Sequence, residues 1–149
     1  MGLTDDLGRG PLGVDTALFI YFIEEHPRFL PLIEPLFTAA DAGRRELVTS
    51  ALSLLEVLVV PYRAGNQALA ERYESLLTRS RGIRSVELTR DQLRSAAQLR
   101  AATGINTPDA LQLAAAISAG CTSFITNDRR FPAIPGTRVL QLADYAARG

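Results

Sequence analysis

Several residue types are missing or scarce in this chain of 149 residues, and each absence excludes a class of protein. Lysine is absent, so all 16 basic residues are arginine. P-loop NTPases, phosphoaspartate receiver domains and haloacid-dehalogenase-like phosphatases all need a lysine in the site. The sequence therefore belongs to none of these three classes of phosphate chemistry.

Cysteine and histidine each occur once, as Cys121 and His26. A single cysteine excludes an internal disulfide and a zinc cluster of several thiolates. We expect Cys121 to pack in the core, because it opens an apolar strand and has no histidine beside it in the sequence. His26 precedes Pro27 at the expected end of a helix, so we expect a surface residue and not a general base.

Long apolar runs are also absent, so the sequence predicts no transmembrane helix and no membrane partner. The first residues are acidic and polar and do not resemble a secretory signal, which makes the cytoplasm the simplest location. The net charge is zero, so no global field indicates a nucleic-acid partner.

The chain is 47% hydrophobic and 21% charged, which is typical of one globular domain with a substantial core. Residues 1–11 contain glycine and aspartate and have no apolar period, so we expect a flexible leader there. Residues 12–149 form a single domain in this interpretation.

Apolar segments with the periods of strands and helices alternate along residues 12–149. The expected strands are 12–15, 47–49, 83–88, 122–126 and 138–142. The expected helices are 16–25, 32–42, 50–63, 66–78, 89–103 and 107–119. Such alternation predicts an α/β fold, a three-layer α/β/α sandwich around a mostly parallel sheet of five strands. In such sheets the site lies beyond the carboxyl ends of the strands.

Four acidic residues occupy positions that this fold would bring together. Asp15 ends the first strand, and Asp128 follows the strand 122–126. Asp109 lies in the first turn of a helix whose expected start has Thr107 as capping hydroxyl and a proline next. Glu56 lies in a helix with apolar neighbours on both sides, and a lone buried glutamate is rare unless it is paired or binds a metal.

Converging carboxylates need protons or a cation. Two of them about 4 Å apart repel by roughly 4 kcal/mol at an effective dielectric constant near 20. An all-oxygen set of ligands suits Mg²⁺ or Mn²⁺, and these ions activate water for phosphodiester cleavage. Each acid alone has a simpler interpretation: Asp15 as a helix cap, Asp109 as a partner of the helix dipole, and Asp128 as the cap of a turn.

The chain resembles the PIN-domain ribonucleases, in particular the VapC-type toxins of bacterial toxin–antitoxin pairs. The resemblance covers nearly all of the chain from about residue 12, and four segments carry it. They are Val14-Asp15-Thr16, Thr49-Ser50-Ala51-Leu52-Ser53-Leu54-Leu55-Glu56-Val57-Leu58, Thr107-Pro108-Asp109-Ala110-Leu111-Gln112-Leu113-Ala114 and Phe124-Ile125-Thr126-Asn127-Asp128-Arg129-Arg130-Phe131. One departure is Ala17, where the family usually has asparagine or serine.

The resemblance implies that Asp15, Glu56, Asp109 and Asp128 are the catalytic and metal-binding acids. Asp15 and Asp109 would be the direct ligands of Mg²⁺ or Mn²⁺. Thr126 and Thr16 would be supporting hydroxyls that position the phosphate. The resemblance also implies hydrolysis of RNA, a homodimer, and inhibition by an antitoxin protein whose tail covers the acidic pocket.

Two other hypotheses stay open at this point. The same fold and chemistry can act in RNA processing without a toxin role, and a neighbouring antitoxin gene would distinguish the two. Alternatively, the chain can be an inert protein-interaction module, and a metal titration would decide that.

Overall fold

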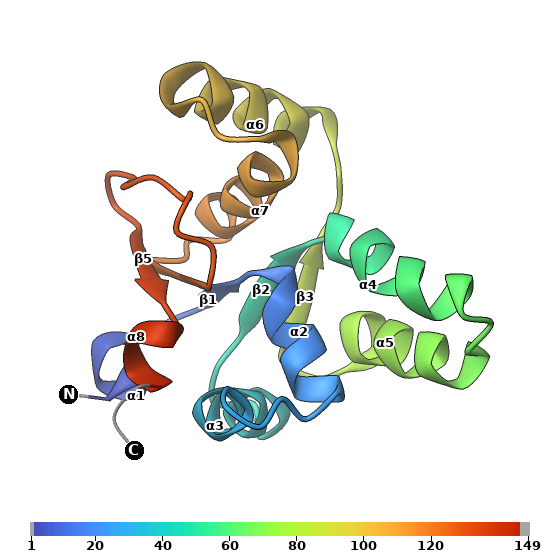
Figure 1. Ribbon diagram of the computed structural model, residues 1–149. Coiled ribbons are helices and arrows are strands. Elements are labelled where there is room, and N and C mark those ends of the chain that lie inside the picture. Colours follow the sequence, from blue (N-terminus) through green and yellow to red (C-terminus); the bar gives the residue numbers. More distant parts are fainter. Residues whose placement is uncertain (1, 147–149) are drawn as a thin grey trace.

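The computed structural model describes residues 2–146, which form a central sheet flanked by helices (Figure 1). The strands are β1 (Leu12–Val14), β2 (Leu47–Ser50), β3 (Ile83–Val86), β4 (Ser123–Thr126) and β5 (Arg138–Gln141). The helices are α1 (Leu3–Asp6), α2 (Thr16–Ile23), α3 (Leu30–Asp41), α4 (Leu52–Arg63), α5 (Gln67–Arg79), α6 (Arg90–Thr103), α7 (Thr107–Ser118) and α8 (Ala143–Ala146).

The five strands form one sheet in the order β3-β2-β1-β4-β5, and every pair is parallel. The chain builds the sheet outward from β1 in one direction and then returns to add β4 and β5 on the other side. The strand order therefore reverses between β1 and β4, and open parallel sheets bind ligands at such a point, beyond the carboxyl ends. The expected α/β/α sandwich is confirmed, with a sheet that is wholly parallel.

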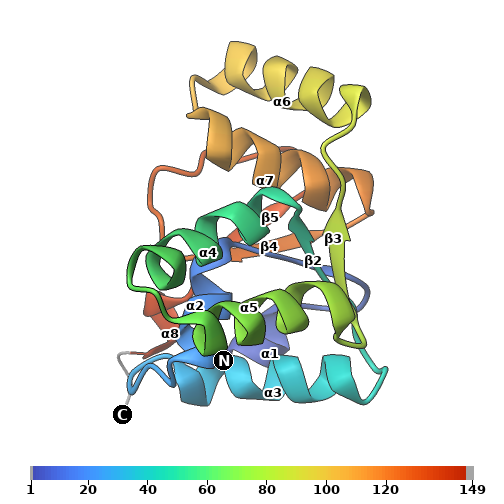
Figure 2. The ribbon, with the colours of Figure 1, turned by 90° about the vertical axis from the view of Figure 1, so that its right-hand side faces the viewer.

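Helices cover both faces of the sheet and bury two separate apolar clusters. On one face α7 packs against β1 and β2, and α6 lies over α7 (Figure 2). On the other face α3 packs against β2 and α5 against β3. Neighbouring strand residues alternate between the clusters: Phe124 belongs to the cluster with α7, and Ile125 to the opposite one. This is the period of two that a strand buried on both faces requires.

Gly13, which weakens β1 by propensity, is required by the packing of α7. A Cβ atom at Gly13 would lie 2.7 Å from the Cβ of Ala116 and 2.7 Å from Cδ1 of Phe124. Only a residue without a side chain lets α7 approach this closely. The helix that starts at Asp109 is thereby held directly above the strand that ends at Asp15.

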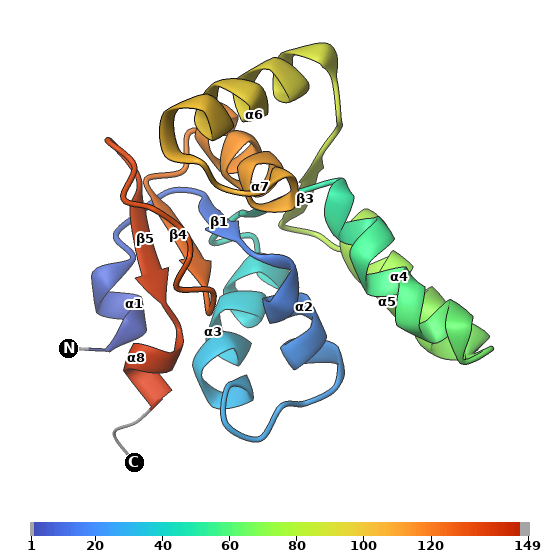
Figure 3. The same ribbon diagram turned by 45° about the horizontal axis from the view of Figure 1, so that its top comes forward.

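The helices α4 and α5 form a hairpin that extends away from the sheet (Figure 3). Its outer surface is apolar: Leu55 is 62% exposed and Val60 is 66% exposed. The sequence expectation that Glu56 is buried by its apolar neighbours is therefore wrong, because Glu56 lies on the exposed side of α4. No helix within residues 2–146 is long and apolar enough to cross a membrane.

The amino-terminal segment differs from the flexible leader that the sequence predicts. Residues 3–6 form α1, and Leu3 and Leu7 are buried in the larger apolar cluster. Arg138 donates a hydrogen bond of 2.7 Å to the carbonyl of Asp6, and Ser123 donates one of 3.3 Å to that of Leu7. Two leucines four residues apart are too few to produce a recognisable period, which explains why the sequence gave no sign of this packing.

Candidate active site

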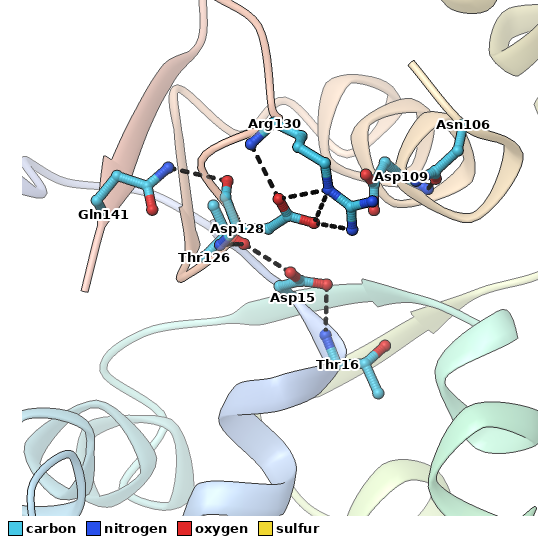
Figure 4. Close-up of polar contacts among 8 residues, drawn as sticks. All are labelled: Asp15, Thr16, Asn106, Asp109, Thr126, Asp128, Arg130 and Gln141. Carbon is cyan, nitrogen blue, oxygen red and sulfur yellow. Dashed lines mark hydrogen bonds and ion pairs between the residues drawn. The ribbon is translucent and has the colours of Figure 1, made fainter. Parts of the chain in front are cut away.

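The centre of the site is the junction between the carboxyl ends of β1 and β4. Asp15 caps α2 and accepts a hydrogen bond of 2.9 Å from the backbone N–H of Thr16. Its other carboxylate oxygen accepts a bond of 2.6 Å from the hydroxyl of Thr126, the last residue of β4 (Figure 4). The pairing of β1 with β4 continues through the backbone N–H of Asp15, which donates to the carbonyl of Ile125 at 3.0 Å. The position of Asp15 is thus fixed by two strands and a helix.

Asp128 is held by the same threonine and by an arginine. Its backbone N–H donates to the hydroxyl of Thr126 at 3.0 Å. The guanidinium of Arg130 contacts both carboxylate oxygens, with Nη2 2.7 Å from Oδ2 and Nε 3.0 Å from Oδ1. These hydrogen bonds lower the pKa of Asp128. Asp128 is therefore ionised and already paired in this structure.

Asp109 lies in the first turn of α7, as the sequence predicts, but the capping residue is different. The side chain of Asn106 accepts the hydrogen bond from the backbone N–H of Asp109 at 2.9 Å, so Asn106 is the cap and not Thr107. Within the part of the chain that the structure describes, Oδ2 of Asp109 is buried and has no hydrogen-bond partner. A buried carboxylate oxygen without a donor is costly and indicates a missing positive partner.

Glu56 joins the site from α4 through Thr16. The hydroxyl of Thr16 donates a bond of 2.7 Å to Oε1 of Glu56, and it is also 2.7 Å from the hydroxyl of Ser53 one turn earlier. Because Thr16 follows Asp15 directly, this contact ties α4 to the acidic end of β1. The helix α4 thus contributes Glu56 through a hydrogen bond, although the glutamate is not buried.

Electrostatic repulsion connects the four acids. Burial is the largest cause that raises the pKa of Asp15, and the charges of Glu56 and Asp128 raise it further. Burial also raises the pKa of Asp109, with additional repulsion from Asp128 and Asp15. Arg130 opposes these effects, and Figure 4 shows its side chain extending from Asp128 toward Asp109. The site therefore has an excess of negative charge that one arginine only partly neutralises.

Whether a divalent cation fits here can be judged from these donors. Among residues 2–146, no three acidic, histidine or cysteine side chains are arranged as a ready metal-binding group. The donors are nevertheless all carboxylate oxygens, two of the aspartates have raised pKa values, and Oδ2 of Asp109 has no partner. This set fits a hard cation such as Mg²⁺ or Mn²⁺, provided that the side chains move closer when it binds.

The two supporting hydroxyls orient acids in this structure. Thr126 has no exposed surface and engages Asp15 and Asp128, so it cannot contact a phosphate directly as expected. Thr16 is buried and engages Glu56. Both residues belong to the site, with the carboxylates and not the phosphate as their partners.

Two groups of residues complete the site beyond the expected acids and threonines. Arg130 pairs with Asp128, and the Arg129-Arg130 pair next to this acid was the sequence signal for it. A buried polar network of Thr49, Ser53 and Gln112 was missed. The available signal was Gln112 itself, the single polar residue in the apolar stretch from Ala110 to Ala116.

The isolated histidine and cysteine take no part in the site. Nδ1 of His26 accepts the backbone N–H groups of Arg28 and Phe29 at 3.2 and 3.3 Å, so it is not available as a base. Its ring is half-buried and stacks on Phe29, in contrast to the exposed position expected. Cys121 is buried in the core as predicted, and burial raises the pKa of its thiol to about 11.

Comparisons with known proteins agree with this geometry. The chain is similar in structure to VapBC2 from Rickettsia felis bound to a DNA fragment from the promoter, with a TM-score of 0.66 and 16% identity over 88% of this chain and 98% of that one. It is also similar to a toxin–antitoxin complex from Klebsiella pneumoniae, with a TM-score of 0.64 and 18% identity over 90% of this chain and 98% of that one. A third similar structure is DNA-bound VapBC from Salmonella typhimurium, with a TM-score of 0.58 and 19% identity over 91% of this chain and 99% of that one.

At these identities the three structures show a shared fold. No curated protein matches the chain in sequence. A family model described as PIN domain matches residues 13–136, which include all four acids of the site. The chain therefore belongs to the PIN-domain family.

Proposed function

We propose that this PIN-domain protein is an endoribonuclease that depends on Mg²⁺ or Mn²⁺. The observation that carries the proposal is the unpartnered Oδ2 of Asp109, buried above Asp15 at the point where the strand order reverses. A carboxylate kept in this state destabilises the fold, which is typical of a functional group. Binding of a divalent cation would give this oxygen its partner.

The residues have distinct parts in the proposed reaction. A bound Mg²⁺ or Mn²⁺ would supply an activated water and would stabilise the charge that develops on the phosphate. Asp15 and Asp109 would hold the ion directly, and Asp128 and Glu56 would complete the acidic set. Thr126 keeps Asp15 oriented through its bond of 2.6 Å, and Thr16 does the same for Glu56.

Arg130 is the one basic side chain paired with an acid of this set in the described residues. Its guanidinium is exposed and reaches both Asp128 and the neighbourhood of Asp109. When a cation replaces it there, the arginine becomes available for a phosphate oxygen of the substrate, which it can bind with two donors. The zero net charge of the chain makes such local cations the main attraction for RNA.

We further propose that the protein is the toxin of a toxin–antitoxin pair in the cytoplasm, with an antitoxin protein that covers the acidic pocket, and that it forms a homodimer. The support is structural similarity to two VapBC complexes and a toxin–antitoxin complex. An RNA-processing nuclease without a toxin role would share the site but would lack an antitoxin encoded beside it. An inert interaction module would share only the fold.

Cleavage of total RNA by the purified protein tests the proposal. We expect discrete fragments with Mg²⁺ or Mn²⁺, and none with EDTA or with the Asp109→Asn variant. Asp91→Asn is the matched control, because Asp91 lies on α6 and is paired with Arg94 outside the site. Absence of cleavage by folded, antitoxin-free protein with either metal would favour the inert module.

A further inference from the structure

The amide of Gln112 lies at the centre of a buried network that connects the helices carrying the acids. Gln112 is 2% exposed and projects from α7 one turn after Asp109. Its Nε2 is 3.0 Å from the hydroxyl of Thr16 and 2.9 Å from the hydroxyl of Ser53. Its Oε1 is 3.0 Å from the hydroxyl of Thr49 and 3.1 Å from the backbone nitrogen of Ser50.

The orientation of this amide is determined by its neighbours. A backbone N–H can only donate, so the Gln112 atom that faces Ser50 must be the oxygen. The amide nitrogen then faces the two hydroxyls and uses both of its protons on them. Every donor and acceptor site of the side chain that could be left unsatisfied by burial therefore has a partner.

This orientation passes to the acids. Because Gln112 can only donate through Nε2, Thr16 accepts there and directs its own proton to Glu56 at 2.7 Å. Each partner of the amide is also close in sequence to an acid: Thr16 follows Asp15, and Ser53 precedes Glu56 by one helical turn. One side chain thus links α2, α4, α7 and the carboxyl end of β2 at the base of the site.

We propose that Gln112 is a positioning residue, which sets the relative placement of Asp15, Glu56 and Asp109 for metal binding and RNA cleavage. This role rests on the nuclease function proposed above. It acts through the hydroxyls of Thr16 and Ser53 and needs no contact with the metal or the RNA. Buried partners of metal ligands have this effect generally, since they hold the ligand side chains in one orientation.

A purely structural role would also require the network to be intact, and the two roles differ in what a substitution changes. A structural residue affects the unfolding temperature alone. A positioning residue also affects the affinity for metal while the protein is folded. The control is Gln92, a second buried glutamine whose Nε2 donates to Ser118 at 2.9 Å, between α6 and the far end of α7.

The test compares the full-length protein with Gln112→Met and Gln92→Met, which both remove an amide and keep the length of the side chain. Mn²⁺ affinity is measured by calorimetric titration, RNA cleavage at saturating Mn²⁺, and folding by circular dichroism and thermal unfolding. We expect Gln112→Met to raise the Kd for Mn²⁺ and lower kcat by about tenfold each. Gln92→Met should stay within twofold of the wild type in both, whatever its effect on unfolding temperature.

Ser53→Ala is the second variant, in case Gln112→Met does not fold. It removes one acceptor of the Gln112 amide with a much smaller change of volume, and we expect a weaker loss of Mn²⁺ affinity, about threefold. Wild-type Kd and kcat in a folded Gln112→Met protein, or in Ser53→Ala if the former is unfolded, would overturn the inference alone. A wild-type protein that binds no Mn²⁺ would overturn the proposed function, and the inference with it.

Discussion

The hydroxyl of Thr126 donates a hydrogen bond of 2.6 Å to Asp15, and this bond joins the carboxyl ends of β4 and β1. The two strands are neighbours in the sheet but are more than 100 residues apart in the chain. The hydrogen bond favours the ionised form of Asp15 against the effect of burial. Thr126 therefore keeps a buried aspartate available to bind a cation.

Replacing Thr126 by valine should weaken cleavage and shift its pH dependence. Without the hydroxyl the pKa of Asp15 rises further, because the bond that lowers it is lost. A carboxylate must be ionised to bind metal, so the acidic limb of the pH profile should move to higher pH, with about tenfold lower activity near neutrality. Thr137→Val is the control, a buried threonine outside the site. An unchanged acidic limb would contradict the assigned role.

Asp109→Asn should stabilise the metal-free protein at neutral pH. The pKa of Asp109 is raised in the fold above its ordinary value of 3.8, so the folded state holds a proton that the unfolded state has released. The free energy of unfolding therefore falls as the pH rises from 3.8 through the raised value, and it stays lower above it. Asparagine has no such charge, and we expect a gain of about 1 kcal/mol at pH 7.

Urea unfolding in EDTA at pH 5 and pH 8 measures this effect. The difference in unfolding free energy between the two pH values should be smaller in Asp109→Asn than in the wild type. Asp91→Asn serves as the reference, because Asp91 is exposed and paired with Arg94. A loss of stability in Asp109→Asn at pH 8 would show that the carboxylate is satisfied in the fold, contrary to its unpartnered oxygen.

Arg130→Gln should increase the affinity for Mn²⁺. The guanidinium pairs with Asp128 at 2.7 Å, and an incoming cation has to compete with this contact. We expect a Kd for Mn²⁺ that is about two- to fivefold lower, a modest gain because the ion pair is exposed to solvent. Arg129→Gln provides the comparison, since Arg129 is paired with Asp144 away from the acids. Weaker Mn²⁺ binding in Arg130→Gln would mean that the arginine supports the metal site.

Leu7→Ala should destabilise the protein although Leu7 lies in the segment for which the sequence predicts no structure. Leu7 is 1% exposed, and buried Leu→Ala substitutions cost about 2–5 kcal/mol of unfolding free energy. Leu55→Ala is the matched control, because Leu55 is 62% exposed on α4 and should change stability by less than about 0.5 kcal/mol. Equal unfolding free energies for the two variants would show that the amino-terminal segment is not part of the folded core.

The sequence predicts the sheet and the location of Asp15, Asp109 and Asp128 well, for a physical reason. Parallel strands and their crossover helices place all carboxyl ends at one edge, so a residue at a strand end or in a first helical turn has only one place to be. Asn106 was missed as the cap of α7 because Thr107 and Pro108 also fit the pattern of a helix start.

The environment of Glu56 could not be predicted in the same way. An apolar run such as Leu54 to Val60 suggests burial on all sides, yet α4 lies in a hairpin whose outer face meets solvent. Which face of a helix is covered depends on the arrangement of distant elements and not on the run itself. The contact of Glu56 with Thr16, 40 residues apart in the chain, likewise exists only in the folded structure.

The most direct measurement is a calorimetric titration of the full-length protein with Mn²⁺, beside Asp109→Asn and Asp91→Asn. No three acidic side chains of residues 2–146 are preformed as a metal-binding group, so binding has to be demonstrated. We predict saturable binding to the wild type and to Asp91→Asn, and at least tenfold weaker binding to Asp109→Asn. Equal Mn²⁺ affinity in all three proteins, or no binding by the folded wild type, would contradict a metal-dependent nuclease site at Asp109.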